Sequence, residues 1–597
     1  MRSRPSDETD ATIPGLLGRQ AAALGDSLAF AFLEDGRIEG EGLSFAELDA
    51  DARALAAALQ TRHAPGARAL LLFPAGLDFL RAFFGCLYAG LIAIPAPAPE
   101  ASRRKRTLPR LRAIARDADV SLALSTGATL ALVREMAANL PELAAADVQD
   151  SRETGAAADW RVPEIGSDDV AYLQYTSGST TDPKGVMLSH ANVLHHCRDL
   201  RAANGYGPES VSVTWLPYFH DYGLIEGLLA PLQNGTPCHV MSPFAFLKRP
   251  FAWLNAMSAL GATNSQGPNF AFDQCVRRIR PEQRAKLDLS HVVSIGNGAE
   301  PVNPAVVDAF IEAFAPCGLR AEAITPAYGL AEATLMMSCR RPGLSPHFEA
   351  FDARALADRR ARPARVGAEA RRIASCGAPL GDVDIAIVDP ETGSRRAPGD
   401  IGEIWVSDPA VALGYWRRPD STRETFQARI ADDGAGPYLR TGDLGFLHGG
   451  ELYVSGRIKD LIIVAGANHY PQDIEWTVEQ AHPAVRPGHV AAASFFAGGE
   501  ERLLVAPEIE RGAIGSAEEA EALIAAIRRA VTEGHEVAVD AVIALRRGSL
   551  QKTASGKIQR HTCARLADEP SEDVVVLWRT GMTKPQLLGL GEPVSEE

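Results

Sequence analysis

The stretch from Val170 to Gly185 constrains the fold of this 597-residue chain more than any other part of it. Residues 170–175 are apolar and aromatic, which predicts a strand, and the run Thr176-Ser177-Gly178-Ser179-Thr180 follows at once. A glycine lets the backbone approach an anion closely, and hydroxyl and N–H groups can surround phosphate oxygens. Lys184 adds a positive charge. The stretch therefore predicts a phosphate-binding loop at the end of a strand in an α/β enzyme.

An ordinary polar turn with a surface lysine is the plainer interpretation of the same residues. The Gly-Lys-Ser/Thr ending of a Walker A loop is missing from this run, so a phosphate loop of that class is excluded. Small hydroxyl residues stand on both sides of a glycine, and Pro-Lys-Gly follows them. The length of this unusual run favours phosphate binding.

Strand and helix patterns alternate along the chain from about residue 43. Residues 45–62 have helical spacing, 69–73 form a short apolar run, 77–90 again have helical spacing, and 91–95 are apolar. Such alternation predicts parallel sheets with helices on both faces, an α/β fold. A chain of this length exceeds one compact core, so we expect two or more domains.

Five further motifs follow the predicted phosphate loop. Together with it, they resemble in sequence and order the adenylate-forming superfamily, which includes acyl-CoA synthetases, luciferases, adenylation domains and fatty acyl-AMP ligases. The resemblance extends from about residue 43 to residue 560. The motifs are Trp215-Leu216-Pro217-Tyr218-Phe219-His220-Asp221, Tyr328-Gly329-Leu330-Ala331-Glu332, Tyr438-Leu439-Arg440-Thr441-Gly442-Asp443, Gly456-Arg457-Ile458-Lys459-Asp460 and Thr553-Ala554-Ser555-Gly556-Lys557-Ile558-Gln559-Arg560.

The resemblance implies a large N-terminal domain of parallel-rich sheets flanked by helices, and a small α+β C-terminal domain joined to it by a hinge. We expect the first domain over residues 14–459 and the second over 460–570, with Asp460 as the hinge residue. An insertion is expected at about 340–373, and residues 571–597 are left as a tail without a role. A plain hairpin around residues 452–464 is the alternative to the hinge.

The resemblance also implies a nucleotide site. Tyr328 is expected against the adenine, while Asp443 can accept hydrogen bonds from the two ribose hydroxyls. Arg457 offers a planar cation to ribose or phosphate. The full set of expected ATP- and AMP-binding residues is Thr176, Ser177, Gly178, Ser179, Thr180, Lys184, Gly298, Ala299, Glu300, Tyr328, Gly329, Asp443 and Arg457.

Three residues are the catalytic candidates. Lys557 lies in a glycine-containing loop, where a mobile cation can bridge a carboxylate and the α-phosphate that it attacks. Glu332 is expected to hold Mg²⁺, because a carboxylate beside a triphosphate needs a bridging cation. His220 follows an aromatic run and is expected to border the carboxylate pocket of the substrate.

Each residue has a plainer interpretation when it is taken alone. Glu332 can stabilise a helix N-terminus, and Arg457 can belong to a surface ion pair. Lys557 can be a solvated loop lysine, and a lone histidine such as His220 is usually a satisfied core residue.

Three departures from acyl-CoA synthetases indicate the fatty acyl-AMP ligase branch. Thr181 replaces the usual glycine, residues 466–475 resemble the signature of that branch, and a long segment separates Glu332 from Ser375. In that branch the insertion is linked to loss of CoA ligation, and we expect apolar contacts from Phe348 and Phe351 to bridge the domains.

The chain is therefore predicted to convert a fatty acid and ATP to acyl-adenylate and pyrophosphate, and to load the acyl group on an acyl carrier protein acting in trans. Two alternatives stay open. A long-chain acyl-CoA synthetase would use CoA as the acceptor, and a non-catalytic scaffold would only bind an adenylate. A basic surface containing Arg546, Arg547 and Lys552 is the predicted docking place for an anionic acceptor.

Composition narrows the remaining classes. A net charge of -15 argues against nucleic-acid binding, and 46% hydrophobic with 23% charged residues is typical of a globular domain. The longest apolar run, from Ala82 to Ile94, is too short to span a bilayer. The 8 cysteines are scattered, which predicts reduced thiols and a cytoplasmic location.

Overall fold

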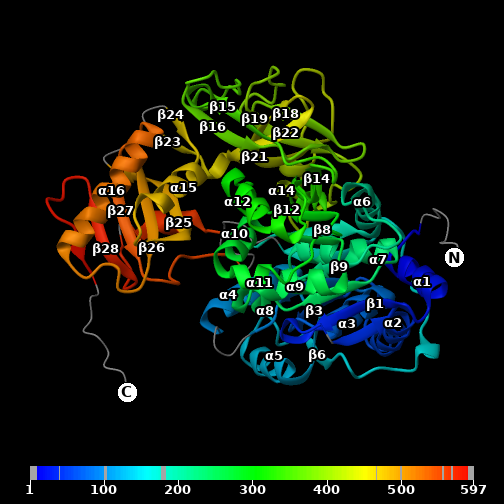
Figure 1. The fold of residues 1–597 in the computed structure, drawn as a ribbon. Helices are drawn as coiled ribbons and strands as arrows, with labels where there is room; N and C mark the ends of the chain where they lie inside the picture. The colour runs from blue at the N-terminus through cyan, green and yellow to red at the C-terminus, as the bar shows by residue number, and fades with distance from the viewer. Residues whose placement is uncertain are drawn as a thin grey trace.

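The computed structural model shows a large body of sheets and helices with a smaller C-terminal domain at one side (Figure 1). This arrangement confirms the predicted α/β class. The structure describes residues 10–38, 40–99, 104–175, 183–464, 467–497, 500–553, 557–566 and 569–588.

The first large sheet has nine strands in the described chain, and its central strands are parallel. Its antiparallel edges are β14 with β17 at one side and β2 at the other. In spatial order the strands are β17 (Ala378–Pro379), β14 (Met336–Cys339), β13 (Ile324–Gly329), β12 (Ser294–Asn297), β11 (Asn264–Gly267), β9 (Ser212–Thr214), β10 (Cys238–Met241), β1 (Leu28–Leu33) and β2 (Glu41–Ser44).

The second large sheet has seven strands in the described chain. Its parallel pair β3 and β4 is almost wholly buried, as expected for strands covered on both faces. In spatial order the strands are β20 (Gly414–Tyr415), β8 (Gly185–Ser189), β7 (Val170–Tyr175), β4 (Ile92–Pro97), β3 (Arg68–Phe73), β5 (Leu122–Ser125) and β6 (Asp147–Asp150).

Helices cover these sheets, and local sequence explains where several of them begin. Helix α2 starts at a capping box in which the Ser44 hydroxyl accepts from the Glu47 N–H and the Glu47 carboxylate accepts from the Ser44 N–H. The α-helices are α1 (Ile13–Leu24), α2 (Phe45–Gln60), α3 (Leu77–Tyr88), α4 (Arg104–Ala118), α5 (Gly127–Asn139), α6 (His190–Ala203), α7 (Ala230–Asn234), α8 (Pro243–Lys248), α9 (Phe251–Leu260), α10 (Asn269–Arg278), α11 (Pro281–Arg284), α12 (Pro304–Phe314) and α14 (Pro419–Phe426). Shorter turns are η1 (Glu34–Gly36), η3 (Ala157–Asp159), the π-helix η4 (Tyr222–Leu229), η5 (Ala315–Cys317), η6 (Ala321–Ala323), η7 (Ala331–Ala333) and η8 (Ile458–Asp460).

A four-stranded antiparallel sheet and a small hairpin lie at the top of Figure 1, above the large sheets and to the right of the C-terminal domain. The sheet consists of β18 (Asp384–Val388), β19 (Gly402–Ser407), β21 (Leu439–His448) and β22 (Glu451–Arg457). The hairpin consists of β15 (Phe348–Asp352) and β16 (Ala370–Ala374) with α13 (Ala353–Ala357) between them, so the predicted insertion is an ordered part of the fold.

The C-terminal domain is built on a five-stranded sheet in the described chain. Its strands are β25 (Val485–Ala497), β26 (Glu500–Ile509), β27 (Val539–Leu545), β28 (Val574–Arg579) and β29 (Gln586–Leu587), and its helices are α15 (Pro471–Ala481), α16 (Ala517–His535) and α17 (Arg560–Leu566). Because β28 pairs with β27, the sheet takes in residues that the sequence analysis left in the tail.

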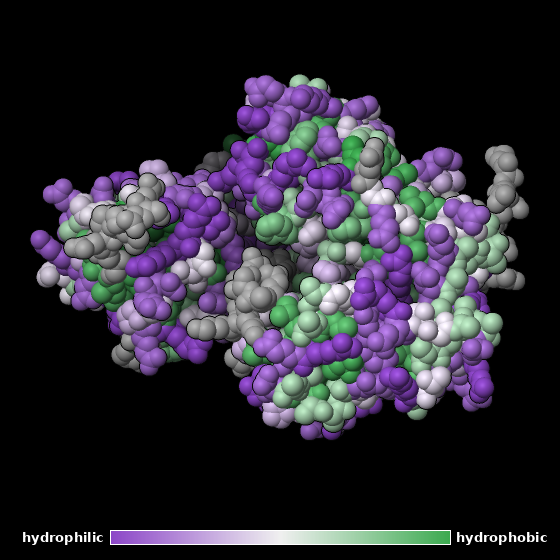
Figure 2. Space-filling model, turned by 90° about the horizontal axis from the view of Figure 1, so that it is seen from below, coloured by the Kyte–Doolittle hydropathy of each residue, from purple (hydrophilic) through white to green (hydrophobic). Residues whose placement is uncertain are grey.

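The joint between the two domains is not the plain hairpin considered above. Strand β22 pairs with β21, whereas β23 (Ile462–Val464) pairs with β24 (Ala467–His469). Seen from below, the surface is hollowed between the C-terminal domain and the large body (Figure 2). None of the helices in the described part of the chain combines the length and hydrophobicity that crossing a lipid bilayer requires.

Candidate active site

Three of the predicted nucleotide-binding residues form one hydrogen-bonded cluster. Asp443 of β21 and Arg457 of β22 are cross-strand partners, and Arg457 Nε donates to Asp443 Oδ1 over 2.8 Å. The Tyr328 hydroxyl, at the end of β13, donates to Asp443 Oδ2 over 2.9 Å. The negative charge of Asp443 raises the pKa of Arg457. Each carboxylate oxygen of Asp443 keeps a further lone pair, so the cluster can still accept ribose hydroxyls.

Glu332 lies in a second cluster with Lys184. Its carboxylate accepts a hydrogen bond from the Tyr415 hydroxyl at 2.9 Å, and Lys184 Nζ lies 4.6 Å from the centre of the Tyr415 ring. Strand β20 pairs with β8, which places Tyr415 opposite Val186 and close to Lys184. Burial raises the pKa of Glu332, although the Tyr415 hydrogen bond acts in the opposite direction.

Lys557 comes from the C-terminal domain and lies within electrostatic reach of the large domain. Its backbone is held by Thr553, whose side-chain oxygen accepts from the Lys557 N–H over 3.1 Å. Burial lowers the pKa of Lys557, and the charge of Arg457 lowers it further, whereas Asp221, Glu300 and Asp443 partly offset both. The ammonium of Lys557, from the C-terminal domain, is therefore near enough to interact electrostatically with the Asp443–Arg457 cluster of the large domain.

His220 lies beside Asp221 at the start of η4, with 2.5 Å between His220 Nδ1 and Asp221 Oδ1. Burial alone disfavours the charged form of Asp221, but the charges of His220 and Lys557 outweigh it and lower the pKa of Asp221. The carbonyl of Phe219 accepts from Gln174 Nε2 over 2.9 Å, which anchors this loop to β7.

The loop after β12 carries Gly298, Ala299 and Glu300. Ala299 has a φ of 70°, in the left-handed region. Glu300 Oε1 accepts from the Phe270 N–H at the start of α10 over 3.3 Å, and burial raises the pKa of Glu300. The side chain of Glu300 therefore fixes the loop to α10, and the backbone of the loop remains the part that can face a nucleotide.

Gly329 follows Tyr328 where β13 pairs irregularly with β14. A Cβ atom at this position would lie 1.6 Å from the carbonyl oxygen of Leu335. Only glycine fits such a close approach of two backbone segments, so Gly329 fixes the geometry of the loop that carries Glu332.

Asp460, the predicted hinge residue, contacts the helix that follows Lys557. Arg560 Nη1 donates to Asp460 Oδ2 over 2.9 Å, and the same guanidinium forms two hydrogen bonds with Glu475, of 2.7 and 2.8 Å. This ion-pair network joins η8, α15 and α17 within the C-terminal domain. The predicted residues Thr176, Ser177, Gly178, Ser179 and Thr180 lie outside the described residues.

The described residues include no group of three or more His, Cys, Asp or Glu side chains that could hold a metal ion. Mg²⁺ often binds through one or two carboxylates and substrate phosphates, so a buried single carboxylate such as Glu332 fits this ion without a preformed cluster.

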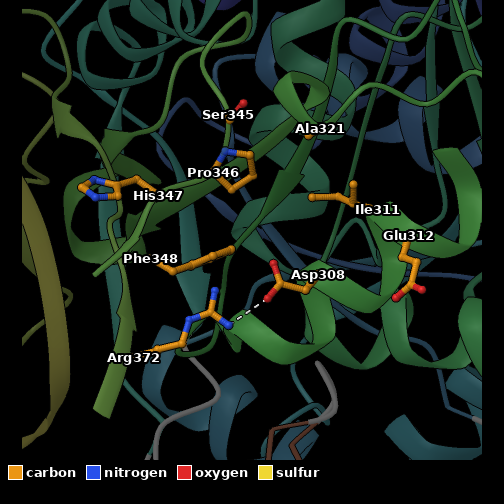
Figure 3. A pocket seen from close by; sticks show the side chains of 9 residues that line it. All are labelled: Asp308, Ile311, Glu312, Ala321, Ser345, Pro346, His347, Phe348 and Arg372. Carbon is orange, nitrogen blue, oxygen red and sulfur yellow. Dashed lines mark hydrogen bonds and ion pairs between the residues drawn. The ribbon is translucent and has the colours of Figure 1, made fainter. Parts of the chain in front are cut away.

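A surface groove lies apart from these clusters, between α12 and the insertion (Figure 3). Arg372 pairs there with Asp308 over 2.9 Å and lies 5.2 Å from the centre of the Phe348 ring. Its lining residues are Asp308, Ile311, Glu312, Ala321, Ser345, Pro346, His347, Phe348 and Arg372. None of the predicted site residues lines this groove.

The insertion contacts the C-terminal domain through polar groups as well as apolar ones, since Leu461 packs against the buried cluster that contains Phe351. Phe351 packs against Phe446 and Tyr453 of the large domain, with ring centres 4.9 and 5.4 Å away. The polar contacts across the boundary include the ion pairs Arg371–Asp473 and Arg354–Glu536 and a hydrogen bond from the Asn468 side chain to the Ala357 carbonyl.

Sequence analysis missed Tyr415 and gave Asp221 no role. Asp221 is adjacent to His220 in the motif that ends at residue 221, and this pair of neighbouring ionisable residues could have indicated a role for Asp221. Tyr415 had no such signal, because its partner Glu332 is 83 residues away in the chain.

Comparisons with known proteins agree with this geometry. A family model described as AMP-binding enzyme matches residues 17–416, and one described as Disco-interacting protein 2-like, AMP domain, matches residues 459–566. The medium-chain-fatty-acid–acyl-carrier-protein ligase JamA of Moorena producens is 49% identical over 541 residues, which cover 90% of this chain and 91% of JamA. The long-chain-fatty-acid–AMP ligase FadD26 of Mycobacterium marinum is 38% identical over 579 residues, which cover 93% of this chain and 97% of FadD26.

A solved structure is also similar. The fatty acyl-adenylate ligase from L. pneumophila in complex with acyl adenylate and pyrophosphate has 36% sequence identity and a TM-score of 0.73. The match covers 95% of this chain and 98% of that one. The chain therefore belongs to the AMP-binding enzyme family of adenylate-forming enzymes, and within it to the fatty acyl-AMP ligases.

Proposed function

We propose that this enzyme joins a fatty acid to ATP, releases pyrophosphate and then transfers the acyl group from acyl-adenylate to an acyl carrier protein. The observation that carries the proposal is the hydrogen-bonded cluster of Tyr328, Asp443 and Arg457, with which Lys557 of the C-terminal domain interacts electrostatically. Family membership supports the first step, and the relative JamA, a ligase for a carrier protein, supports the second.

In the first step a carboxylate oxygen of the acid forms a bond to the α-phosphorus of ATP. The bond from that phosphorus to the bridging oxygen breaks, and pyrophosphate leaves with the electron pair. Two anions must approach each other, so the Lys557 cation lowers the barrier by contacting both. Asp443 and Arg457 hold the ribose, and Tyr328 supports the adenine side.

Glu332 and Lys184 complete the phosphate side of the proposed site. Glu332 would hold Mg²⁺ together with phosphate oxygens, and the ion supplies charge neutralisation on the triphosphate. The Tyr415 hydroxyl fixes the Glu332 carboxylate, while its ring positions the Lys184 ammonium. His220 borders the bound carboxylate and is itself held by Asp221.

In the second step the thiol of the carrier's phosphopantetheine attacks the acyl carbon, a thioester forms, and AMP leaves. Arg546 and Arg547, after β27, are exposed and suit an anionic carrier. Lys552 suits it less, because its ammonium donates to the Gly488 carbonyl over 2.7 Å. We place the joint between the two domains at Asp460. We also place the enzyme in the cytoplasm, and the eight free, buried cysteines support this location.

The test is a pyrophosphate-release assay with a series of saturated fatty acids and Mg·ATP, followed by mass spectrometry of acyl-AMP. CoA and a pantetheinylated carrier protein are then compared as acceptors. Acyl-AMP formation followed by carrier loading is the expected result. Absence of pyrophosphate release with every acid would leave only the scaffold interpretation, and efficient acyl-CoA formation would favour a CoA ligase.

A further inference from the structure

Buried polar side chains line the face of η4 that looks toward β12. Tyr222 and Glu226 are four residues apart, which places them on the same side of the helix. Tyr222 is 4% exposed and Glu226 is 3% exposed. This helix begins directly after His220 and Asp221, and β12 ends directly before the loop of Gly298 to Glu300. The polar face therefore lies immediately behind the proposed active site.

Several polar atoms of this region make no hydrogen bond within the described residues. They are the Tyr222 hydroxyl, Glu226 Oε2 and both side-chain polar atoms of Asn297. Asn204 Nδ2 lies close enough to Glu226 to act on it as a hydrogen-bond donor, but this contact falls outside normal hydrogen-bond geometry. More than nine in ten buried polar groups in folded proteins have a partner, and a buried group left without one destabilises the fold. Such a cluster is a site for a further polar group.

The Tyr222 hydroxyl and the Glu226 carboxyl point at the same place. A Cβ atom on Gly296 would lie 2.5 Å from the Tyr222 hydroxyl oxygen and 3.0 Å from Glu226 Oε1. A Cβ atom on Gly298 would lie 3.8 Å from the same hydroxyl. The absence of a side chain at Gly296 therefore allows both polar groups to pack against the backbone of β12 at the same residue.

The cluster is suited to an uncharged group. Burial raises the pKa of Glu226 to about 8, with Asn204 as a partial offset. The carboxyl is therefore mainly protonated at neutral pH, and it can donate one hydrogen bond and accept others. A hydroxyl or keto oxygen can pair with such a set, whereas a second carboxylate would bring an uncompensated charge into a buried place.

The cluster also lies where the chain of an acid substrate is expected to run. With its carboxyl group near Lys557 and His220, the substrate has to extend along η4. Tyr222 belongs to a buried apolar cluster that also contains Ile225, Leu335 and Met336, so the surroundings of η4 suit an aliphatic chain. Glu226 lies one turn further along η4 than Tyr222, so it is farther from the carboxyl group of the acid than Tyr222 is.

We propose, on the basis of the proposed function, that Tyr222 and Glu226 form a polar subsite that binds a hydroxyl or keto oxygen on the aliphatic chain of the acid. The enzyme then prefers an acid with an oxygen substituent in mid-chain to the unsubstituted acid of equal length. Leaving the subsite's groups unpaired is what disfavours the plain acid.

The experiment compares decanoic acid with its monohydroxy and monooxo derivatives, with the oxygen moved along the chain. The ratio of kcat/KM for each derivative to kcat/KM for decanoic acid is measured by pyrophosphate release. We expect at least one derivative to exceed decanoic acid tenfold or more. In Glu226→Leu and in Tyr222→Phe this ratio should fall at least tenfold, and Glu226→Gln should keep part of the preference because an amide still forms hydrogen bonds.

Three results separate the explanations. If decanoic acid is the best substrate of the wild-type enzyme, or if the ratio is unchanged in both variants, the cluster holds ordered water and the inference is wrong. If neither acid class releases pyrophosphate, the proposed function itself fails. Tyr222→Phe removes only one oxygen atom, so it carries the test if Glu226→Leu does not fold, as judged by thermal unfolding.

Discussion

The guanidinium of Arg371, in the insertion, lies 2.9 Å from the carboxylate of Asp473, in the C-terminal domain. Both side chains are largely buried, at 17% and 14% exposed, and Arg371 also lies 4.8 Å from the centre of the Tyr470 ring. Acyl-adenylate formation and thioester formation need different orientations of the two domains. A buried ion pair across the boundary favours the orientation in which it forms, and only a few kcal/mol of bias depopulate the other.

We predict that the wild-type enzyme makes acyl-AMP but negligible acyl-CoA, and that Arg371→Met raises acyl-CoA output. The substitution removes the charge that joins the domains, so the C-terminal domain gains freedom to rotate. Acyl-CoA is measured by liquid chromatography with CoA in excess. Removal of the whole segment from about Pro342 to Arg372 is a cruder test, because it takes away Phe351 and uncovers Phe446 and Tyr453.

A matched control is available on the same surface. Arg354 pairs with Glu536 across the same boundary, but the two side chains are 77% and 64% exposed, so water already screens them. Arg354→Ala should leave the product ratio unchanged. If Arg371→Met adenylates normally and still makes no acyl-CoA, the ion pair does not restrict the rotation of the C-terminal domain. Substantial acyl-CoA from the wild-type enzyme would argue against assigning the chain to the fatty acyl-AMP ligases.

We predict that Lys557→Ala lowers acyl-AMP formation by about 10²–10³-fold while ATP affinity changes little. The ammonium acts on charge that develops in the transition state, so its loss lowers turnover more than ground-state binding. Pyrophosphate release gives the rate, and calorimetric titration gives the ATP affinity. Lys552→Ala, in the same segment, is the control and should keep most of the activity. Near-normal adenylation by Lys557→Ala would remove this residue from the mechanism.

We predict that Asp443→Ala weakens ATP binding by about 1.5–3 kcal/mol, the range for a hydrogen bond to a charged group. The change removes the acceptor for the ribose and also leaves Arg457 and Tyr328 without their partner. Tyr328→Phe separates the two effects, since it removes one internal hydrogen bond but keeps the carboxylate. An unchanged ATP affinity of Asp443→Ala in calorimetric titration would place the ribose elsewhere.

The sequence predicts the strands well where short apolar runs end at Pro or Gly. Residues 170–175 form β7 as predicted, and the predicted strand 69–73 begins one residue earlier. The helix expected over 77–90 ends at Tyr88, because Gly90 takes a φ of 75°. Strand β12 begins only at Ser294 although Val292 and Val293 precede it, because the Val292 N–H donates to the Leu289 carbonyl and closes a turn.

Contacts between segments that are far apart in the sequence could not be predicted from local sequence patterns. The partner of a buried charge depends on how whole elements pack, so no local pattern near Arg371 indicates Asp473, and none near Glu332 indicates Tyr415. Glu226 sits in the apolar run Leu224-Ile225-Glu226-Gly227-Leu228, where a charged residue is unusual. An acidic residue within an apolar run indicates a buried carboxyl, but the sequence analysis assigned no role to Glu226.

We predict that Gly329→Ala destabilises the large domain by about 1–3 kcal/mol, the usual cost of forcing extra volume into a packed place. The new methyl group would overlap the Leu335 carbonyl, so the β13–β14 connection would have to move. Thermal unfolding of the intact protein measures the effect. Gly207→Ala is the control, because a Cβ atom there has no neighbour within 4 Å. Equal melting temperatures for the two variants would contradict the close approach at Gly329.

We predict that the rate of adenylation falls as the pH is raised, and that this fall occurs at a lower pH than it would for a lysine with an ordinary pKa. Burial lowers the pKa of Lys557 below its usual value, and Arg457 adds to this effect. A lysine is cationic below its pKa, so raising the pH through the lowered pKa removes the cation that the reaction needs. The rate of pyrophosphate release is followed at saturating substrate from neutral pH to about 10.4, the usual pKa of lysine.

Lys557→Arg identifies the group responsible for this loss. Arginine stays protonated over the whole range, so the alkaline fall should disappear even if the altered shape of the side chain lowers the rate at every pH. An alkaline fall that is the same in both proteins would assign the titration to another group. The carboxylates of Asp221, Glu300 and Asp443 partly offset the lowering of the Lys557 pKa. In the enzyme that keeps Lys557, Asp443→Asn should therefore move the alkaline fall in rate to a still lower pH.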